Sequence, residues 1–516
     1  MNVGMLIPRH AKYRGDHLAL VCGDTRLSFG ELGARVNRVA NAFLALGLRK
    51  GDRIAVVVPN CLEVLEIYWA AIQIGLVLVP LSPLLRGPAL ASLLNDSNAS
   101  AVVGAHELAE ELITIRDAVP MIAPARWVEI GGGSAEGVAS GFTSYRVLVS
   151  AQSTSAPPTV EIGGDDLFNI IYSSGTTGMP KGIVHTHDIR AMYCTLFASA
   201  FRFTPESVVL HAGSLVFNGA FVTLMPALFL GTTYVLQQRF DAREFIEIVE
   251  REQVTHVMMV PSQILAVMNA PNFAPHKLRT LQMLGSVGAP LHREHKERLV
   301  SALPNVFYEL YGLTEGVITI LDKFDVARKA QSVGISTPFF EMRIVGEDGR
   351  DLPAGEVGEI VGRSPLLMPG YHGRPDLTSQ AIVDGWMHTG DMGYLDEDGF
   401  LYLVDRKKDL IISGGVNVYP KDIEEVVVTH PDVVEAAVFG IPNEKWGEAP
   451  LGAVVLRAGS SIAAGDLKTW VNARVGARYQ QLCDVVIVAE FPRNAAGKTL
   501  KRVMRDEYWK ERAVKI

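Results

Sequence analysis

Cysteine is scarce in this sequence, with four residues among 516, at positions 22, 61, 194 and 483. Their spacing contains no Cys-x-x-Cys pair and no other pattern typical of a metal site. Sparse, scattered cysteines fit a reducing compartment, in which each serves as a small buried hydrophobe. The cysteines therefore indicate neither a disulfide framework nor a structural metal.

An excess of positive charge is absent as well. The 48 Lys and Arg residues are outnumbered by 56 Asp and Glu residues, which gives a net charge of −8. No run of Lys or Arg stands out, whereas a nucleic-acid-binding protein needs a clustered basic face. We therefore predict no nucleic-acid partner.

Long apolar runs are also missing. Residues 1–8 lack a basic stretch followed by an apolar core, so we expect no signal peptide. The most apolar segment, residues 219–236, contains Pro226 and Gly231 and is shorter than a typical membrane span. We interpret it as buried core. The expectation is a cytoplasmic enzyme without a transmembrane segment.

Helix-like and strand-like patterns alternate in the first part of the chain. Residues 28–47 show the spacing of an amphipathic helix that ends at Gly47. A short β-branched run follows at 53–58, then a second helix at 61–75 and a second strand at 76–79. This alternation predicts an α/β fold with layered helices.

The length of the chain exceeds what one compact core holds, so we expect at least two domains. Residues 131–158 are rich in Gly, Ser, Ala, Thr and Pro, which we interpret as a surface excursion. Between residues 333 and 403, repeated Asp-Gly and Ala-Gly pairs predict a β-rich subdomain built from hairpins. The dense charge run 405–409 is a hinge candidate. We predict a large N-terminal domain at 1–405, a hinge at 406–410 and a small α+β domain at 411–516.

The segment 172–182 (Tyr-Ser-Ser-Gly-Thr-Thr-Gly-Met-Pro-Lys-Gly) carries the strongest chemical signal. It follows the apolar run 167–171, so we expect a loop that leaves a strand. Glycine lets backbone N–H groups approach phosphate oxygens, and Lys181 adds a positive charge. The segment is not a Walker A loop, because Lys181 stands between a proline and a glycine. We interpret it as a phosphate-binding loop rather than a plain polar turn.

This segment resembles the phosphate loop of the adenylate-forming superfamily, which includes acyl-CoA synthetases, beetle luciferases and the adenylation domains of peptide synthetases. Further matches follow along nearly the whole chain. The resemblance implies that ATP is bound in this loop by Ser173, Ser174, Gly175, Thr176, Thr177, Gly178 and Lys181.

A second motif is Tyr-Gly-Leu-Thr-Glu at residues 311–315. It offers an aromatic face for a purine, a hydroxyl, and a carboxylate able to hold Mg²⁺ on a phosphate. The resemblance implies that Thr314 contacts the α-phosphate and that Glu315 holds the magnesium. It also places around the nucleotide the residues Gly288, Ala289, Pro290, Glu309, Leu310, Tyr311 and Gly312.

Single residues further along complete the family pattern. An aspartate can accept both hydroxyls of a ribose, and the resemblance gives this role to Asp391, with Arg406 beside it. It implies that Lys498 is the catalytic lysine, which neutralises the approach of the carboxylate to the α-phosphate. It makes Lys408 the hinge residue and Gly415 part of the coenzyme A tunnel. The small C-terminal domain is then mobile and rotates between an adenylating and a thioester-forming pose.

One departure from the family lies near the acyl pocket. Many acyl-CoA synthetases carry an aromatic residue followed by histidine here, whereas this chain has Phe217 followed by Asn218. Asparagine keeps hydrogen bonding but cannot become cationic. The small residues Gly219 and Ala220 leave room for a bulky or long acyl group. The predicted acyl pocket comprises Phe217, Asn218, Val287, Gly312 and Val317.

The sequence is thus identified as a member of the acyl-CoA synthetases, with ATP, Mg²⁺ and coenzyme A as its cosubstrates and cofactor. The expected substrate is an apolar carboxylic acid: medium- or long-chain fatty, aryl or alicyclic. Three alternatives remain: transfer of the acyl group to a carrier protein, luciferase-like oxidation of the adenylate, and a non-catalytic nucleotide sensor. We expect a monomer or homodimer.

Overall fold

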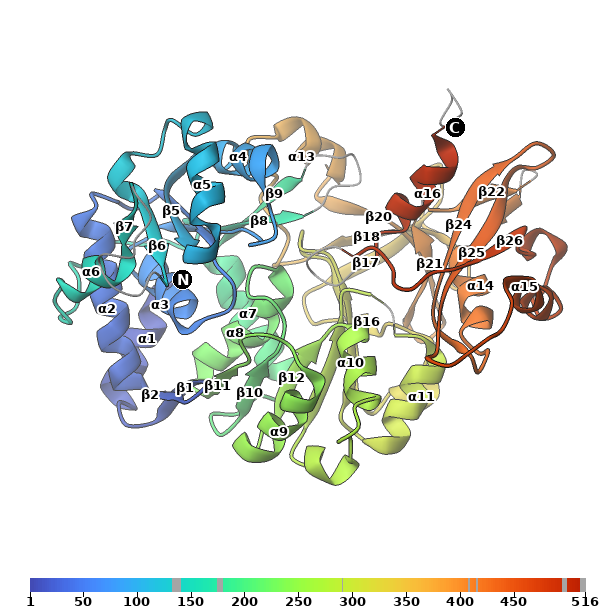
Figure 1. The fold of residues 1–516 in the computed structure, drawn as a ribbon, viewed down its shortest axis with the longest axis horizontal. Coiled ribbons are helices and arrows are strands. Elements are labelled where there is room, and N and C mark those ends of the chain that lie inside the picture. Colours follow the sequence, from blue (N-terminus) through green and yellow to red (C-terminus); the bar gives the residue numbers. More distant parts are fainter. Residues whose placement is uncertain are drawn as a thin grey trace.

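The computed structural model describes residues 1–131, 141–173, 180–289, 291–406, 409–413, 416–493 and 499–510. Four sheets organise it, and Figure 1 shows three of them in an N-terminal body (residues 1–406) and the fourth in a C-terminal lobe (residues 411–510). Among the described residues, no helix combines the length and apolar character needed to cross a membrane.

The first sheet has seven strands in the order β7-β6-β5-β3-β4-β8-β9, parallel except for the β8–β9 hairpin. Its strands are β3 (Arg53–Val57), β4 (Val77–Pro80), β5 (Ala99–Ala105), β6 (Trp127–Ile130), β7 (Thr143–Ser144), β8 (Leu167–Ser173) and β9 (Lys181–Thr186). The helices around it are α2 (Phe29–Ala45), α3 (Leu62–Gln73), α4 (Gly87–Asp96), α5 (Ala109–Ile115) and α6 (Tyr145–Ser150). The alternation predicted for residues 28–79 is confirmed, with element ends within two residues.

The second sheet has nine strands in the order β16-β15-β14-β13-β12-β10-β11-β1-β2. Its strands are β1 (Leu18–Cys22), β2 (Thr25–Ser28), β10 (Val208–His211), β11 (Thr233–Leu236), β12 (His256–Met259), β13 (Met283–Val287), β14 (Phe307–Gly312), β15 (Ile318–Leu321) and β16 (Ile335–Ser336). The first strand of the chain thus pairs with β11, in parallel, with Leu20 opposite Tyr234. The N-terminal hairpin therefore belongs to the second sheet, not the first.

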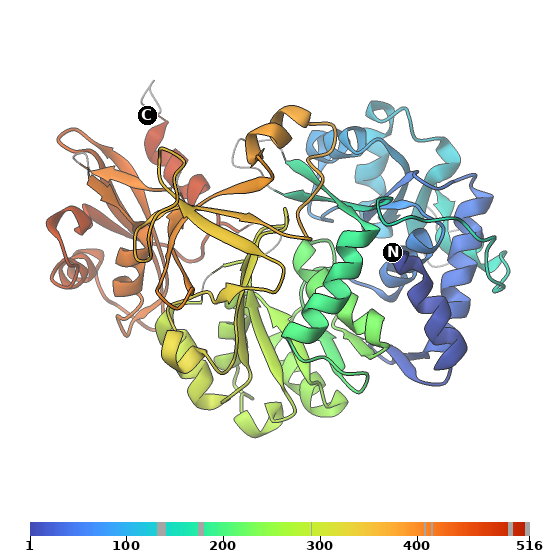
Figure 2. The same ribbon diagram turned by 180° about the vertical axis from the view of Figure 1, so that it is seen from behind.

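Two helices lie between these sheets, α7 (His187–Ala200) and α8 (Asn218–Leu230), as Figures 1 and 2 show. One apolar cluster contains side chains of both sheets together with α2, α3, α7 and α8. Successive residues of a strand point to opposite faces, so Met258 joins this cluster while Val257 and Met259 face outward. That outer face is covered by α9 (Ala242–Glu252), α10 (Pro261–Met268) and α11 (Arg293–Ala302). The apolar segment 219–236 is buried here, as predicted.

The third sheet is antiparallel and forms the β-rich part of the body, as predicted. It comprises β17 (Glu341–Val345), β18 (Gly358–Arg363), β19 (Ile382–Val383), β20 (Trp386–Leu395) and β21 (Leu401–Arg406), with α13 (Pro375–Ala381) beside it. Short strands joined by Gly-containing turns suit such an arrangement.

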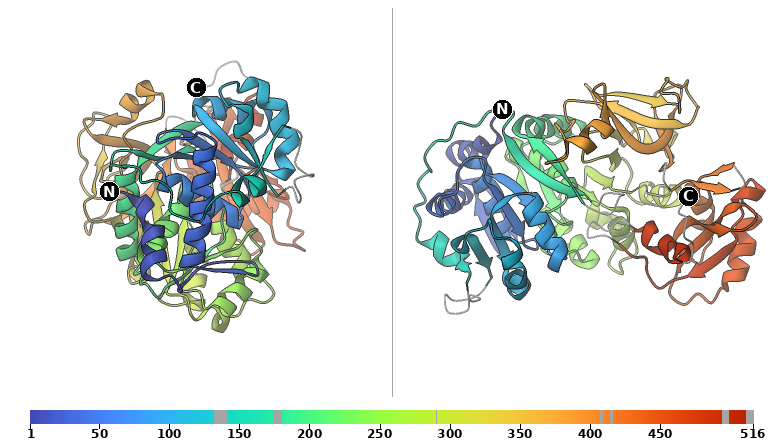
Figure 3. Two further views of the ribbon diagram at one scale, coloured as in Figure 1. Left: turned by 90° about the vertical axis from the view of Figure 1, so that its left-hand side faces the viewer. Right: turned by 90° about the horizontal axis from the view of Figure 1, so that it is seen from above.

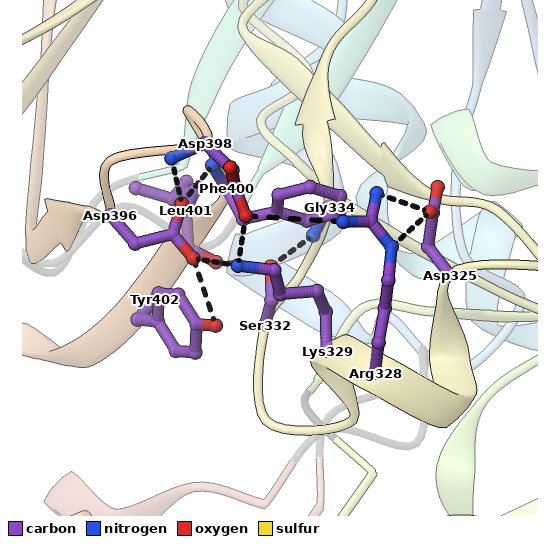
Figure 4. A network of polar contacts seen from close by, with 10 residues as sticks. All are labelled: Asp325, Arg328, Lys329, Ser332, Gly334, Asp396, Asp398, Phe400, Leu401 and Tyr402. Carbon is purple, nitrogen blue, oxygen red and sulfur yellow. Dashed lines mark hydrogen bonds and ion pairs between the residues drawn. The ribbon is translucent and has the colours of Figure 1, made fainter.

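The β20–β21 hairpin is fastened to helix α12 (Val326–Lys329) by the polar network in Figure 4. Lys329 Nζ lies 2.6 Å from Asp396 Oδ2 and 2.8 Å from Asp398 Oδ2, and hydrogen bonds to these carboxylates raise the pKa of Lys329. The Ser332 hydroxyl donates to the Leu401 carbonyl at 2.9 Å. The network therefore fixes the hairpin whose far end carries Asp391.

The C-terminal lobe lies at the opposite end of the molecule from the first sheet (Figure 3). Its elements are β22 (Ile411–Ser413), β23 (Val416–Val418), α14 (Pro420–Val427), β24 (Val433–Asn443), β25 (Gly447–Leu456), α15 (Ala464–Asn472), β26 (Asp484–Ile487) and α16 (Lys501–Trp509). Polar contacts between the described residues join it to the body. His292 Nδ1 lies 3.0 Å from Glu425 Oε1, and Lys421 Nζ donates to the Leu403 carbonyl at 2.6 Å.

Candidate functional site

The phosphate-loop segment connects the two strands of the β8–β9 hairpin. Ser173 ends β8 and pairs with Lys181, the first residue of β9. The expected strand before the loop is confirmed. A strand, not a helix, follows the loop, so the segment does not lead into a helix N-terminus as a Walker A loop does. The predicted residues Ser174, Gly175, Thr176, Thr177 and Gly178 lie outside the described residues.

Thr314 and Glu315 stand in the turn between β14 and β15, closed by a bond from Leu313 N to the Val317 carbonyl at 3.0 Å. The backbone carbonyl of Glu315 accepts from Met368 N at 2.9 Å. The next residue, Gly316, has φ +116°, and a Cβ there would lie 2.2 Å from the Leu366 carbonyl oxygen. Only glycine fits this close approach, and the backbone bonds from Leu313 N and Met368 N hold the turn in place.

Tyr371 links this turn to the phosphate-loop hairpin. Its hydroxyl donates to Glu315 Oε1 at 2.9 Å, and Lys181 Nζ lies 4.9 Å from the centroid of its ring. Burial raises the pKa of the Glu315 carboxyl, and the hydrogen bond from Tyr371 and the charge of Lys181 act in the opposite direction. A buried carboxylate whose charge is only partly compensated is suited to a cation.

The donor set around Glu315 is compatible with magnesium. Among the described residues, no group of three or more His, Cys, Asp or Glu side chains could hold a metal ion. Mg²⁺ is often bound by one or two carboxylates together with substrate phosphates. Glu315 beside the phosphate-loop hairpin offers that combination.

The predicted ribose residues lie opposite each other on neighbouring strands. Asp391 on β20 pairs with Arg406 on β21. Asp391 Oδ2 accepts from the Tyr311 hydroxyl at 2.8 Å, and Asp391 N donates to Thr389 Oγ1 at 3.1 Å. The β-rich sheet thus meets β14 of the second sheet at this point, and Tyr311 and Asp391 come from segments 80 residues apart.

The segment predicted around the adenine follows β13. Gly288 has φ +90°, and the Leu291 N–H donates to Glu309 Oε1 at 3.0 Å. The other carboxylate oxygen of Glu309 forms an ion pair with Lys296, and both side chains are buried. The carboxylate of Glu309 therefore holds this segment in place through its hydrogen bond to Leu291 N. Leu310 is buried on the same strand, Ala289 follows Gly288, and Pro290 lies outside the described residues.

The acyl-pocket candidates divide into two groups. Phe217 precedes α8, Asn218 begins it, and a Cβ at Gly219 would lie 3.8 Å from Val287 Cγ1. The start of α8 therefore faces the end of β13. Val317 is buried and packs against Gly362 on β18, beyond Gly312 at the end of β14. The structure brings Phe217, Asn218 and Val287 together and places Val317 on the side of the third sheet.

Three residues of this site were absent from the sequence analysis: Tyr371, His185 and Arg190. His185 Nε2 donates to the Thr314 carbonyl at 2.9 Å, and Arg190 Nη2 donates to His185 Nδ1 at 3.2 Å. Arg190 had a usable signal, since it is the one charged residue inside the apolar stretch 189–201. Tyr371 had none, because its partner Glu315 is 56 residues away.

The remaining predicted residues belong to the C-terminal part of the chain. Lys408, Gly415 and Lys498 lie outside the described residues.

Comparisons with known proteins agree with this geometry. The sequence profile of the AMP-binding enzyme family matches residues 7–372, and that of the AMP-binding enzyme C-terminal domain matches residues 422–498. A feruloyl-CoA synthase from Amycolatopsis is 34% identical over 508 residues, which cover 97% of this chain and 98% of that protein. The long-chain-fatty-acid–CoA ligase FadD13 of Mycobacterium tuberculosis is 34% identical over 512 residues, which cover 98% of each chain. The crystal structure of ATP-bound MatB from Rhodopseudomonas palustris superposes with a TM-score of 0.89 at 30% identity, covering 98% of this chain and 99% of that one.

Proposed function

The chain belongs to the AMP-binding enzyme family and is an AMP-forming carboxylic acid–CoA ligase that uses ATP and coenzyme A, and on that premise we propose its substrate class and the roles of its residues. The acid is apolar: medium- or long-chain fatty, aryl or alicyclic. The carboxylate attacks the α-phosphate of ATP to give acyl-AMP and pyrophosphate. The thiol of coenzyme A then attacks the acyl carbon, loses its proton and displaces AMP.

The observation that carries the adenylation roles is the convergence of three distant segments on Glu315. The β8–β9 hairpin, the 313–317 turn and the 366–371 segment meet through Tyr371 and the Met368–Glu315 backbone bond. Thr314 would contact the α-phosphate, and Glu315 would hold Mg²⁺, which neutralises charge on the phosphates. Asp391 and Arg406 would bind the ribose. These interactions act through positioning and electrostatic stabilisation.

The apolar character of α8 supports the substrate class. Its thirteen residues contain no charged side chain, and its first turn faces Val287 with the small residue Gly219, which Ala220 follows. The relatives that make feruloyl-CoA and long-chain fatty acyl-CoA act on an aryl and an aliphatic acid, as their names state. Each of these acids carries one carboxylate and a largely apolar remainder. Neither would need a positive charge in the acyl pocket.

The C-terminal part would supply the groups specific to each step. Lys498 would neutralise the approach of carboxylate and α-phosphate, and Gly415 would line the path of the coenzyme A thiol. The segment 406–410, with Lys408, would be the hinge between domains at 1–405 and 411–516. A cytoplasmic location stays a prediction.

The test is release of pyrophosphate and AMP, with and without coenzyme A, over acids from acetate to palmitate plus benzoate, cinnamate and cyclohexanecarboxylate. We expect coenzyme A-dependent turnover on one apolar class. Pyrophosphate release that ignores coenzyme A would favour a carrier-protein or oxidative acceptor. ATP binding without release on any acid would favour a nucleotide sensor, and a Lys498→Ala variant would then retain the full response to ATP.

A further inference from the structure

Arg190, on α7, is a charged residue in an apolar interior. Its side chain has no exposed surface, and burial lowers the pKa of its guanidinium to about 10, so it remains protonated at neutral pH. Among the described residues, no carboxylate pairs with it, and its Nη1 has no hydrogen-bond partner. A buried charge without a counter-ion destabilises a fold, so its presence calls for a specific reason.

Aromatic faces take the place of a counter-ion. The guanidinium carbon lies 4.2 Å from the centroid of Phe221, 4.6 Å from that of Tyr193 and 5.7 Å from that of Phe168. Cation–π attraction is strongest where water is excluded. These rings hold the guanidinium plane in place and leave its N–H groups to reach the neighbouring strands.

The N–H groups of Arg190 tie together the base of the phosphate-loop hairpin. Nε donates to Asn169 Oδ1 at 3.1 Å, and Nη2 donates to His185 Nδ1 at 3.2 Å. Asn169 and His185 are paired across β8 and β9. The guanidinium therefore bridges both strands just before and just after the loop.

The bond from Arg190 determines which proton His185 carries. Because Nδ1 accepts from an arginine, which can only donate, the ring proton resides on Nε2. Nε2–H then donates to the Thr314 carbonyl at 2.9 Å. The opposite tautomer would present a lone pair to that carbonyl, and the contact would be repulsive. The chain Arg190–His185–Thr314 thus connects the hairpin to the turn that carries Glu315.

A second branch leads to the acyl pocket. The Tyr193 ring lies against the guanidinium, and the Tyr193 hydroxyl accepts from Asn218 Nδ2 at 3.0 Å. Asn218 begins α8 beside Gly219, which faces Val287. The buried guanidinium is therefore linked to the nucleotide side of the site through His185 and to the acyl side through Tyr193.

We infer that Arg190 is a positioning residue of the adenylation step: through His185 and Tyr193 it holds Thr314 and Asn218 in a fixed relation to the phosphate-loop hairpin. The inference rests on the proposed function, because it assigns Thr314 to the α-phosphate and Asn218 to the acid. Arg190 touches neither substrate. It sets the distance between the two groups that must react.

The kinetic test compares Arg190→Met, Arg190→Lys and a matched control, His187→Asn. His187 is also buried, two residues after His185, but its Nδ1 accepts from Val3 N at 3.3 Å, at the N-terminus of the chain. Adenylation is followed as ATP–pyrophosphate exchange, with rates expressed per active site from a burst titration. We expect kcat to fall roughly tenfold or more in Arg190→Met, with a smaller loss in Arg190→Lys, since misplacement of reacting groups lowers kcat. The dissociation constant for ATP should change less than about threefold in the Arg190 variants. In the His187→Asn control, kcat should also change less than about threefold.

A double-mutant cycle asks whether Arg190 acts through His185. If it does, Arg190→Met combined with His185→Gln loses little more than the larger single loss. Losses that multiply, or a kcat in folded Arg190→Met or Arg190→Lys equal to that of the wild type, would overturn the inference. Should Arg190→Met fail to fold, Arg190→Lys decides the question alone.

A spectroscopic readout separates this inference from the proposed function. In protein labelled with ¹⁵N-histidine, the ring signals of His185, assigned by their loss in His185→Gln, should show the neutral Nε2–H tautomer. In Arg190→Met, which removes the donor to Nδ1, they should shift toward a tautomeric mixture. Unchanged His185 signals would overturn the inference. The expected shift in a protein inactive on every acid would contradict the proposed function instead and leave the Arg190–His185 link standing.

Discussion

The N-terminal body and the C-terminal lobe differ in how they contribute to the site. The body packs two large sheets around shared helices, and one continuous apolar cluster runs through both. The lobe packs one five-stranded sheet against α14, α15 and α16 over two smaller clusters. Thr314, Glu315, Asp391 and Lys181 all lie in the body. The strands beside Thr314, Glu315 and Lys181 contribute to that large core, whereas Asp391 lies in the third sheet, which has its own smaller cluster.

The residues proposed for single steps, Gly415 and Lys498, belong to the C-terminal part of the chain. The contacts that join body and lobe include His292 with Glu425 and Lys421 with the Leu403 carbonyl. Such polar contacts exchange readily with water, whereas a shared apolar core does not. On the proposed roles, binding and step selection would therefore be assigned to separate structural units. The predictions below test that division, in order of decreasing effect.

The largest effect should come from removing one charged group from the body and one from the C-terminal part of the chain. We expect Glu315→Ala and Lys498→Ala each to lower ATP–pyrophosphate exchange by about 10²–10³-fold, because Glu315→Ala removes the proposed ligand of Mg²⁺ and Lys498→Ala removes a positive charge from the phosphates. Thioester formation from supplied acyl-AMP should survive in Lys498→Ala. If Lys498→Ala impaired both half-reactions equally, the lobe would not be specific to one step.

A side chain at position 415 should produce the opposite pattern. Gly415→Leu would narrow the path of the thiol and slow thioester formation roughly tenfold or more, since small misplacements of a reacting group lower the rate steeply. Pyrophosphate exchange should stay within about threefold of the wild-type rate. The control is Gly465→Leu, in the same lobe, where a Cβ meets no atom within 4 Å and the backbone does not have a positive φ. Equal slowing in both variants would point to a general defect of the lobe.

Acid should unfold the body before the lobe. Burial lowers the pKa of His211, His256 and His295 to about 4, and all three lie in the body. Their folded pKa values lie below the unfolded value of about 6.5, so the stability they contribute is present above pH 6.5 and is lost as the pH falls toward 4. Each histidine shifts the unfolding equilibrium by about tenfold per pH unit in that window.

Segment-resolved hydrogen–deuterium exchange at pH 7 and pH 5, corrected for intrinsic rates, measures this difference. Residues 411–516 contain one histidine, His430. Protection should fall in the second sheet of the body and change little in β24 and β25. A uniform fall across both units would mean that they unfold as one.

The smallest effect should follow from removing the contact between His292 of the body and Glu425 of the lobe. His292→Ala and Glu425→Gln should each change the ratio of the two half-reaction rates by about two- to threefold, the range of a partly exposed polar contact between side chains. The matched control is Arg350→Ala, which removes an exposed pair with Asp348 inside the body. A change in the ratio with Arg350→Ala as well would show that the effect is not specific to the interface.

Local signals explain which parts of the fold could be predicted. The helix α2 was recognisable because Ser28 and Glu31 form a capping box at its start and Gly47 follows its end with φ +74°. The helix α6 was not expected, since it lies in the Gly- and Ser-rich stretch 131–158. Pairing across long separations has no local signature, so the place of β1 beside β11 was not foreseen.

The site shows the same limit. Motifs with several adjacent polar residues, such as 311–315, were identified from the sequence together with the family resemblance. Tyr371, His185 and Arg190 are single residues whose roles depend on partners brought together by folding. Glu309 shows the same limit within a recognised motif. The sequence placed it near the nucleotide, but only the folded structure reveals that its carboxylate pairs with Lys296.

The pairing of β1 with β11 also means that β1 cannot complete its sheet until β11 has been translated. Leu20 finds its partner Tyr234 only after about two hundred further residues have been translated. At about 5–20 residues per second, the N-terminal hairpin waits roughly 10–40 s as an unpaired edge. During that interval its apolar strand, Leu18–Cys22, lacks its neighbour on one side, and an unpaired edge of this kind can pair with another chain. The yield of folded enzyme should therefore depend on the rate at which residues 29–236 emerge from the ribosome.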